Sequence, residues 1–252
     1  MSEPKVKLTQ SFQDFFTVVL ANTPELRSKV YQVRYRVYCD EFGYEPVEQF
    51  PNQEETDEYD GYSLHCLIMH KKSGLPAGCV RMVPAYDLDG QHHLLPLEAH
   101  CGESLDQERI DEMNLDRHTV CEISRLAVDR VFRRRTGEEL TRFGEIESLD
   151  VSKQEQRTFS LIAISAFLAA TAMTDLSGKT NVFAMMEPFL PRLMKRSGID
   201  FQKAGFDMDY RGIRAPYFIQ TQSALTHMQE DLRDLYDWIY SQMAEQYKEP
   251  VS

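Results

Sequence analysis

Residues 119–128 carry polar side chains in the middle of an apolar run, where polar groups need a partner or a function. Glu122, Ser124 and Arg125 interrupt a sequence that otherwise predicts a β-strand. Alternation along this strand places Glu122 and Ser124 on one face and Arg125 on the other. Two interpretations of Glu122 are open. It either forms an internal ion pair with an arginine, or acts as a general base whose pKa is raised by burial.

The segment after this strand combines three arginines with a glycine, just before a helix expected at 136–148. Arg133, Arg134 and Arg135 stand shortly before Gly137. Free N–H groups, a helix dipole and guanidinium groups together favour a bound phosphate, although a solvated basic turn is the simpler alternative. In combination with the acidic strand, the segment indicates a ligand that carries both a phosphate and a reactive carbonyl, such as an acyl thioester on phosphopantetheine.

The elements expected around these residues form one α/β domain. Apolar and alternating runs predict strands at 15–21, 63–70, 77–83, 119–128, 181–187 and 215–221. Helical spacing and capping residues predict helices that begin at Pro24 and end near Gly43, and that cover 136–148, 153–174 and 188–197. Residues 87–118 are polar and loop-like. Leu225, Met228, Leu232, Leu235 and Ile239 predict an amphipathic C-terminal helix, which gives a domain at 1–222 and a helix within 223–252 packed on it.

The composition argues against several classes of function. A net charge of −12 disfavours nucleic acid or anionic lipid as a partner of the whole chain. Five cysteines without CxxC spacing disfavour a disulfide framework and a zinc site, and the seven histidines show no metal-ligand spacing. No apolar run reaches the length of a membrane span. We therefore expect a cytoplasmic protein with no metal and no permanently bound cofactor.

Five motifs, in order along the chain, resemble those of the acyl-homoserine-lactone (autoinducer) synthases of the N-acetyltransferase (GNAT) superfamily. They are RYRVY (34–38), GYE (43–45), DEYD (57–60), GCVRMVP (78–84) and CEISRLAV (121–128). Tyr38 and Tyr44 depart from the pattern, since those synthases usually have Phe and Trp there. Residues 185–219 look instead like the PEP-CTERM/exosortase system-associated acyltransferases, a sister family that is also similar to N-acyl amino acid synthases. The resemblance implies a GNAT-like central mixed sheet flanked by helices.

The resemblance also implies roles for individual residues, with Glu122 as the base or the amine-binding carboxylate. The catalytic set is Glu122, Arg125, Ser124 and Arg34. The acceptor-binding set is Asp57, Asp60, Arg81 and Tyr44. The phosphopantetheine-binding set is Val128, Arg133, Arg134, Arg135 and Gly137. The acyl pocket is formed by Met185, Met186, Phe189 and Leu193.

Each of these assignments has a structural alternative. Asp57 and Asp60 could belong to an exposed acidic loop, and Arg34 could form a salt bridge on a helix surface. The methionine-rich stretch could be plain core. A second basic cluster could steer an acidic acyl carrier protein or be a solvated helix face. This cluster consists of Arg192, Lys195, Arg196 and Lys203.

We predict an acyltransferase that moves a long fatty acyl group from an acyl carrier protein or CoA thioester to the amine of an amino-acid-like acceptor. Cys79 and Cys121 lie in predicted strands as packing residues, so we expect direct transfer without a covalent acyl-enzyme. Acyl carrier protein and a small-molecule amine are the expected partners. The alternatives are an autoinducer synthase that uses S-adenosylmethionine, a CoA-dependent acetyltransferase, and a non-catalytic module that binds acyl carrier protein.

Overall fold

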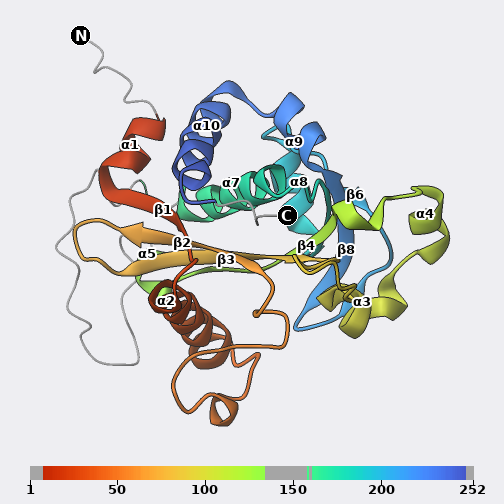
Figure 1. Ribbon diagram of the computed structural model, residues 1–252, viewed down its shortest axis with the longest axis horizontal. Coiled ribbons are helices and arrows are strands. Elements are labelled where there is room, and N and C mark those ends of the chain that lie inside the picture. The colour runs from red at the N-terminus through yellow and green to blue at the C-terminus, as the bar shows by residue number, and fades with distance from the viewer. Residues whose placement is uncertain (1–7, 134–157, 159–160, 248–252) are drawn as a thin grey trace.

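The computed structural model describes residues 8–133, 158 and 161–247, and the helix predicted at 136–148 lies outside them. A mixed sheet with the strand order β1-β2-β3-β4-β5-β8-β6 runs through the molecule, and β7 pairs with β8 (Figure 1). The strands are β1 (Phe16–Leu20), β2 (Leu64–His70), β3 (Pro76–Pro84), β4 (Val120–Val128), β5 (Asn181–Met186), β6 (Gln202–Lys203), β7 (Met208–Asp209) and β8 (Ile213–Gln220). β4 and β5 are parallel, and the other neighbouring strands are antiparallel.

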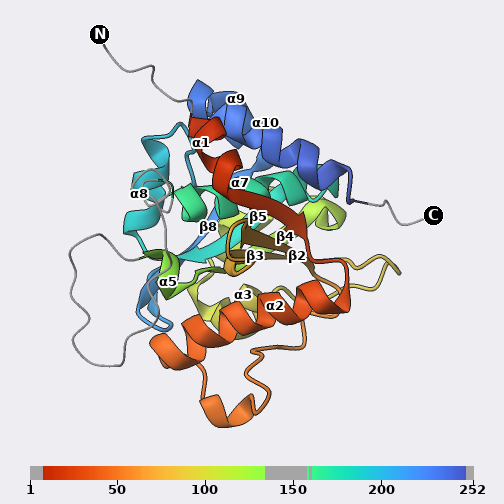
Figure 2. The same cartoon turned by 90° about the vertical axis from the view of Figure 1, so that its left-hand side faces the viewer.

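Helices cover both faces of this sheet. They are α1 (Leu8–Phe15), α2 (Pro24–Arg34), α3 (Pro96–Cys101), α4 (Gln107–Glu112), α5 (Arg130–Arg133), α7 (Leu161–Leu176), α8 (Phe189–Lys195), α9 (Thr221–His227) and α10 (Glu230–Ala244). α2 lies on one face, and α7 lies on the other with α10 packed over it (Figure 2). The predicted fold class, a mixed sheet flanked by helices with a helical C-terminus, is confirmed.

The start of α2 follows from its sequence. The Thr23 side chain accepts a hydrogen bond from the Leu26 N–H, and Pro24 occupies the first turn, where its missing N–H leaves no bond unmade. The helix continues as a π-helix at Tyr35–Glu41, and Gly43 follows with a φ of +60°, a conformation that glycine adopts without strain. The predicted helix and its end are therefore confirmed.

Two predictions about the fold were wrong. Residues 87–118 contain α3 and α4 instead of an irregular loop, and their apolar side chains pack with Phe183 and Phe218 in a second apolar cluster. The C-terminal helix is two helices, because Met228 is extended and the Gln229 N–H donates to the carbonyl of Ser197. α1 was not predicted.

α7 is the central helix of the core. It packs between the sheet and α10, and most of its side chains are buried, as its apolar sequence predicted. No helix in the described part of the chain is both long and apolar enough to cross a membrane.

The parallel strands β4 and β5 separate after a short paired segment. They pair only where residues 120–122 face residues 181–183. β4 remains bonded to β3 beyond this point, and β5 remains bonded to β8. The second halves of β4 and β5 therefore have no strand partner on their facing sides, which opens a gap in the sheet.

A bulge in β4 interrupts the alternation that the sequence predicted. The register between β3 and β4 shifts between Cys79 and Arg81, and Arg125 has a φ of +51°, which is rare for a residue with a Cβ. Ser124 and Arg125 consequently contact the same polar cluster, where Ser124 accepts a hydrogen bond from Arg81 and Arg125 donates to Glu55. Their predicted placement on opposite faces was wrong.

Candidate active site

The gap between β4 and β5 is the entrance to an apolar cavity of about 320 Å³. Ile123 from β4 and Met185 and Met186 from β5 form its walls at the level of the sheet. Phe167 and Ala170 extend the cavity onto α7. A mostly apolar space that begins at a break in a sheet suits one end of a flexible apolar ligand.

Three of the four residues predicted for the acyl pocket line this cavity, namely Met185, Met186 and Phe189. Leu193 does not line it, and its side chain is about half exposed at 52%. Leu193 lies on the outer face of the short helix α8, whereas Leu190 lines the cavity. Ligand binding by this set stays a prediction.

A second, smaller cavity of about 60 Å³ lies beside the first and is polar. Glu122 lines it from β4, Leu97 and Cys101 line it from α3, and Arg211 and Arg214 line it from the segment between β7 and the start of β8. The two cavities share residues 123–125 of β4 as a common wall. A group held in one cavity is therefore next to a group held in the other.

Glu122 is buried and points at a backbone donor instead of an arginine. Its Oε2 accepts a hydrogen bond from the Leu97 N–H at 2.7 Å, and it forms no ion pair within the described residues. Burial raises the pKa of Glu122 to about 7, although the Leu97 N–H and the nearby Arg81 act in the opposite direction. The predicted ion pair with an arginine is therefore not formed. The second interpretation, a carboxyl with a raised pKa, agrees with the structure.

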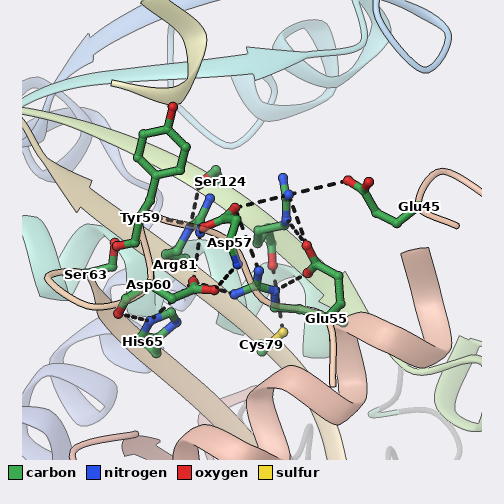
Figure 3. Close-up of polar contacts among 12 residues, drawn as sticks. Glu45, Glu55, Asp57, Tyr59, Asp60, Ser63, His65, Cys79, Arg81 and Ser124 are labelled. Atoms are coloured by element: carbon green, nitrogen blue, oxygen red, sulfur yellow. Dashed lines mark hydrogen bonds and ion pairs between the residues drawn. The ribbon is translucent and has the colours of Figure 1, made fainter. Parts of the chain in front are cut away.

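The predicted charged residues lie together in an ion-pair cluster (Figure 3). Arg34 donates to Asp60 at 2.6 Å and also to Glu55. Arg81 donates to Asp57 at 2.5 Å and to Asp60 at 2.8 Å. Figure 3 shows Asp57, Asp60 and Arg81 pointing toward one another.

Arg125 joins this cluster from the bulge in β4. Its guanidinium lies 3.1 Å from Glu55 and 3.2 Å from Asp57, and 3.6 Å from Glu45. Glu45 also pairs with Arg211 of the small cavity. The cluster therefore fixes both the bulge and the loop that borders the small cavity.

Two structural alternatives for the charged residues were wrong. Arg34 is completely buried, so it is no helix-surface salt bridge, and Asp60 is 4% exposed, so it is no part of an exposed loop. Burial lowers the pKa of Arg34, but Glu55 and Asp60 raise it by more. Burial raises the pKa of Asp60, but Arg34, Arg81 and His65 together lower it by more. Both groups stay charged near neutral pH, so they fix geometry and transfer no protons.

Several residues of the site were missed by sequence reasoning. Glu55 lies two residues before the DEYD motif and belongs to none of the five motifs. His65 has a pKa lowered to about 4 by burial and accompanies Asp60 as a neutral side chain. Leu97, Arg211 and Arg214 belong to segments that carry no recognisable motif, so no local signal marked them.

Tyr44 lies at the large cavity and not at the small one. Its ring stacks on Phe42 at a centroid distance of 5.2 Å, and the guanidinium of Arg214 lies 5.8 Å from its centroid. Tyr38 lines both cavities and donates from its hydroxyl to the carbonyl of Leu126. The role of Tyr44 in acceptor binding stays a prediction.

The segment predicted to bind phosphopantetheine is described only in part. Arg133 donates from Nε to the carbonyl of Val128 at 2.7 Å, pairs with Glu41, and lies over the ring of Phe42. These contacts hold the end of β4 against the π-helix. Arg134, Arg135 and Gly137 lie outside the described residues, so phosphate binding there stays a prediction.

Comparisons with known proteins agree with this architecture. Residues 33–142 match the model of the acetyltransferase (GNAT) domain. No curated protein sequence matches the chain. The fold is similar to TofI in a ternary complex with an inhibitor and MTA, at 17% identity and a TM-score of 0.59, over 87% of this chain and 99% of TofI.

Two further solved structures share the fold. One is BjaI, a CoA-dependent acyl-homoserine lactone synthase with SAM and isopentyl-CoA, at 14% identity and a TM-score of 0.57, over 89% of both chains. The other is FeeM, an N-acyl amino acid synthase from uncultured soil microbes, at 10% identity and a TM-score of 0.53, over 87% of this chain and 97% of FeeM. At these identities the likeness establishes the fold.

Proposed function

We propose that this chain is an acyltransferase that transfers a long fatty acyl group from a carrier thioester to the amine of an amino acid, since its residues 33–142 match the acetyltransferase (GNAT) domain. The observation that carries the proposal is the pair of adjacent cavities along β4. The apolar one suits the acyl chain, and the smaller one is lined by a buried carboxyl and three guanidinium groups. The wall that they share, residues 123–125, is where the thioester carbonyl would meet the amine.

The reaction requires that the acceptor ammonium loses a proton and that a C–N bond replaces the C–S bond of the thioester. The ionised Glu122 takes the proton from the acceptor ammonium, and the free amine attacks the thioester carbonyl. A C–N bond forms, the C–S bond breaks, and the thiol leaves with the proton released from the amine nitrogen. A pKa near 7 suits Glu122 to this task at neutral pH.

A covalent acyl-cysteine intermediate is not part of the proposal. Cys101 lines the small cavity, but burial raises the pKa of its thiol to about 11. Burial likewise raises the pKa of Cys79 to about 12. Thiols with such pKa values are weak nucleophiles at neutral pH. All five cysteines are free, which also supports a reducing, cytoplasmic location.

The surface at the mouth of the large cavity supports acyl carrier protein as the donor. Phe189 is exposed there on α8, and neither Arg192 of α8 nor Arg196, which follows the end of α8, forms an ion pair within the described residues. The other two members of the predicted basic cluster are neutralised, since Lys195 pairs with Asp200 and Lys203 pairs with Asp207. An acidic carrier would therefore meet Arg192 and Arg196.

The acceptor cavity favours an amino acid over S-adenosylmethionine. A volume of about 60 Å³ accommodates an ammonium and a carboxylate group, whereas an adenosine would have to lie outside it. The purified protein, given acyl carrier thioesters, free amino acids and S-adenosylmethionine, is expected to form an N-acyl amino acid and to release no methylthioadenosine. Mass spectrometry checks both products. Stoichiometric methylthioadenosine would identify an autoinducer synthase, and carrier binding without any product would identify a non-catalytic module.

Filling the large cavity should shorten the preferred acyl chain. Ala170 is buried on α7 and lines the cavity, so Ala170→Phe occupies space that the end of a long chain would use. Excluding two methylenes should weaken the longest donor roughly tenfold, at ~0.8 kcal/mol per methylene. Competition between donors of different length measures the preference. Ala163→Phe on the exposed side of α7 is the matched control, and a folded Ala170→Phe variant with unchanged preference would contradict the acyl assignment.

A further inference from the structure

Arg214 is the guanidinium of the small cavity that has no carboxylate partner. It lies at the start of β8, lines both cavities, and forms no ion pair within the described residues. Its Nε is buried and has no hydrogen-bond partner. Its guanidinium lies 5.8 Å from the centroid of the Tyr44 ring, a contact that gives the buried Nε–H no acceptor.

The other two guanidinium groups of this cavity are already neutralised. Arg211 pairs with Glu45, and Arg125 pairs with both Glu55 and Asp57. A buried donor without an acceptor is costly, and proteins retain such groups where a ligand completes the hydrogen bonding. Arg214 is therefore available for an anion that enters the cavity.

We propose that Arg214 binds the α-carboxylate of the acceptor and so restricts the acceptor to amino acids. The inference rests on the proposed function, because it assigns one group of the acceptor within the same site. The small cavity presents one carboxyl, Glu122, and one unpaired guanidinium, Arg214. These two groups are complementary to the ammonium and the carboxylate of a zwitterion.

The size of the cavity agrees with this pairing. A water molecule needs roughly 10–15 Å³ of such volume, so about 60 Å³ holds only a few non-hydrogen atoms. The amino-carboxylate head of an amino acid is of this size. Placed between Glu122 and Arg214, its nitrogen lies next to residues 123–125, where the large cavity begins.

The test compares each accepted amino acid with its own amide and with the amine that lacks the carboxylate. The wild-type protein should prefer the acid in kcat/KM. Arg214→Gln should raise the KM for the acid roughly 10- to 100-fold, the effect expected for loss of a charged hydrogen bond, and should change the KM for the amide and the KM for the donor much less. Arg214→Lys should retain part of the preference.

Arg211→Gln is the matched control, because Arg211 lines the same cavity but is already paired with Glu45. It should retain the preference for the acid. An Arg214→Gln variant that keeps the preference, or that raises the KM for the donor instead, would overturn the inference while leaving the acyltransferase proposal intact. A wild-type protein that acylates the acid and the amide equally would also overturn the inference and leave the acyltransferase proposal intact. If no amine of any kind is acylated, the proposed function fails, and this inference fails with it.

Discussion

Glu122→Gln should fold normally and lower turnover by about two orders of magnitude or more, the usual contribution of a positioned general base. The amide of glutamine keeps the shape of the side chain and can still accept the Leu97 N–H hydrogen bond, which measures 2.7 Å in the wild type. It cannot take a proton from an ammonium at neutral pH. Steady-state kinetics with the acyl thioester and an amino acid measure the loss, and circular dichroism checks the fold.

The pH dependence identifies the reason for that loss. Since burial raises the pKa of Glu122 to about 7, the wild-type kcat/KM should fall as the pH decreases through 7, because the carboxylate becomes protonated. The remaining activity of Glu122→Gln should not show this fall at low pH. Glu98→Gln on α3, a carboxyl that pairs with Arg117 and does not line the small cavity, is the matched control: it should keep this fall in activity, moved to lower pH because the charge of Glu98 helps to raise the pKa of Glu122.

The raised pKa of Glu122 also makes the folded protein less stable as the pH rises. The pKa of Glu122 is higher in the folded protein than its ordinary value of 4.5, so the folded state binds the proton more tightly. Its contribution to the free energy of unfolding is fully present below pH 4.5 and is lost as the pH rises through 7. The loss amounts to roughly 3 kcal/mol at about 1.4 kcal/mol per unit of pKa. The stability of Glu122→Gln should not fall in this way as the pH rises through 7. In the kinetic test, wild-type turnover in this variant would contradict the assignment of Glu122 as the base.

Most of the strands could be predicted because their sequences are locally unambiguous. The run 63–70, the turn at Gly74 and the run 77–83 form the predicted hairpin of β2 and β3, and Gly74 has a φ of +68°. Thr23 and Pro24 likewise mark the start of α2 by capping chemistry that depends on neighbouring residues only. Such signals need no information about the rest of the chain.

The bulge at Arg125 could not be predicted in this way. Strict alternation assumes that each residue of β4 has a partner on β3, and the shifted register appears only in the paired sheet. The ion pairs that offset the cost of the positive φ of Arg125 are also distant in sequence, because they are formed with Glu55 and Asp57. Tertiary contacts therefore override the local pattern here.

The candidate site was predicted where motifs mark it and missed where contacts alone create it. The motif residues Arg34, Asp60 and Arg81 indeed lie together. Leu97 contributes only its backbone N–H, which any residue except proline could provide, and Arg214 stands out only because its buried Nε has no hydrogen-bond partner among the described residues. Neither property is visible in a sequence.

Arg34→Ala should lower the free energy of unfolding by about 3–5 kcal/mol, the cost of removing one partner from a buried ion pair. Arg34 is completely buried, and its loss leaves Glu55 and Asp60 with less compensation for their own burial. Arg81 and Arg125 still pair with these carboxylates, so the protein should fold, with Arg125 and the bulge less firmly held. Urea denaturation measures the change.

A double variant distinguishes the loss of the ion pairs of Arg34 from the loss of its side-chain volume. Arg34→Ala combined with Asp60→Asn should be less destabilised than the sum of the two single variants, because the double variant no longer leaves that carboxylate short of a partner. Arg233→Ala removes an exposed arginine that pairs with Asp237 on α10, and should cost less than about 0.5 kcal/mol. If Arg34→Ala costs no more than this control, the cluster is accessible to water and does not fix the position of Arg125 beside the two cavities. A loss that is large, and non-additive with Asp60→Asn, would establish that the cluster acts as the rigid support of the bulge.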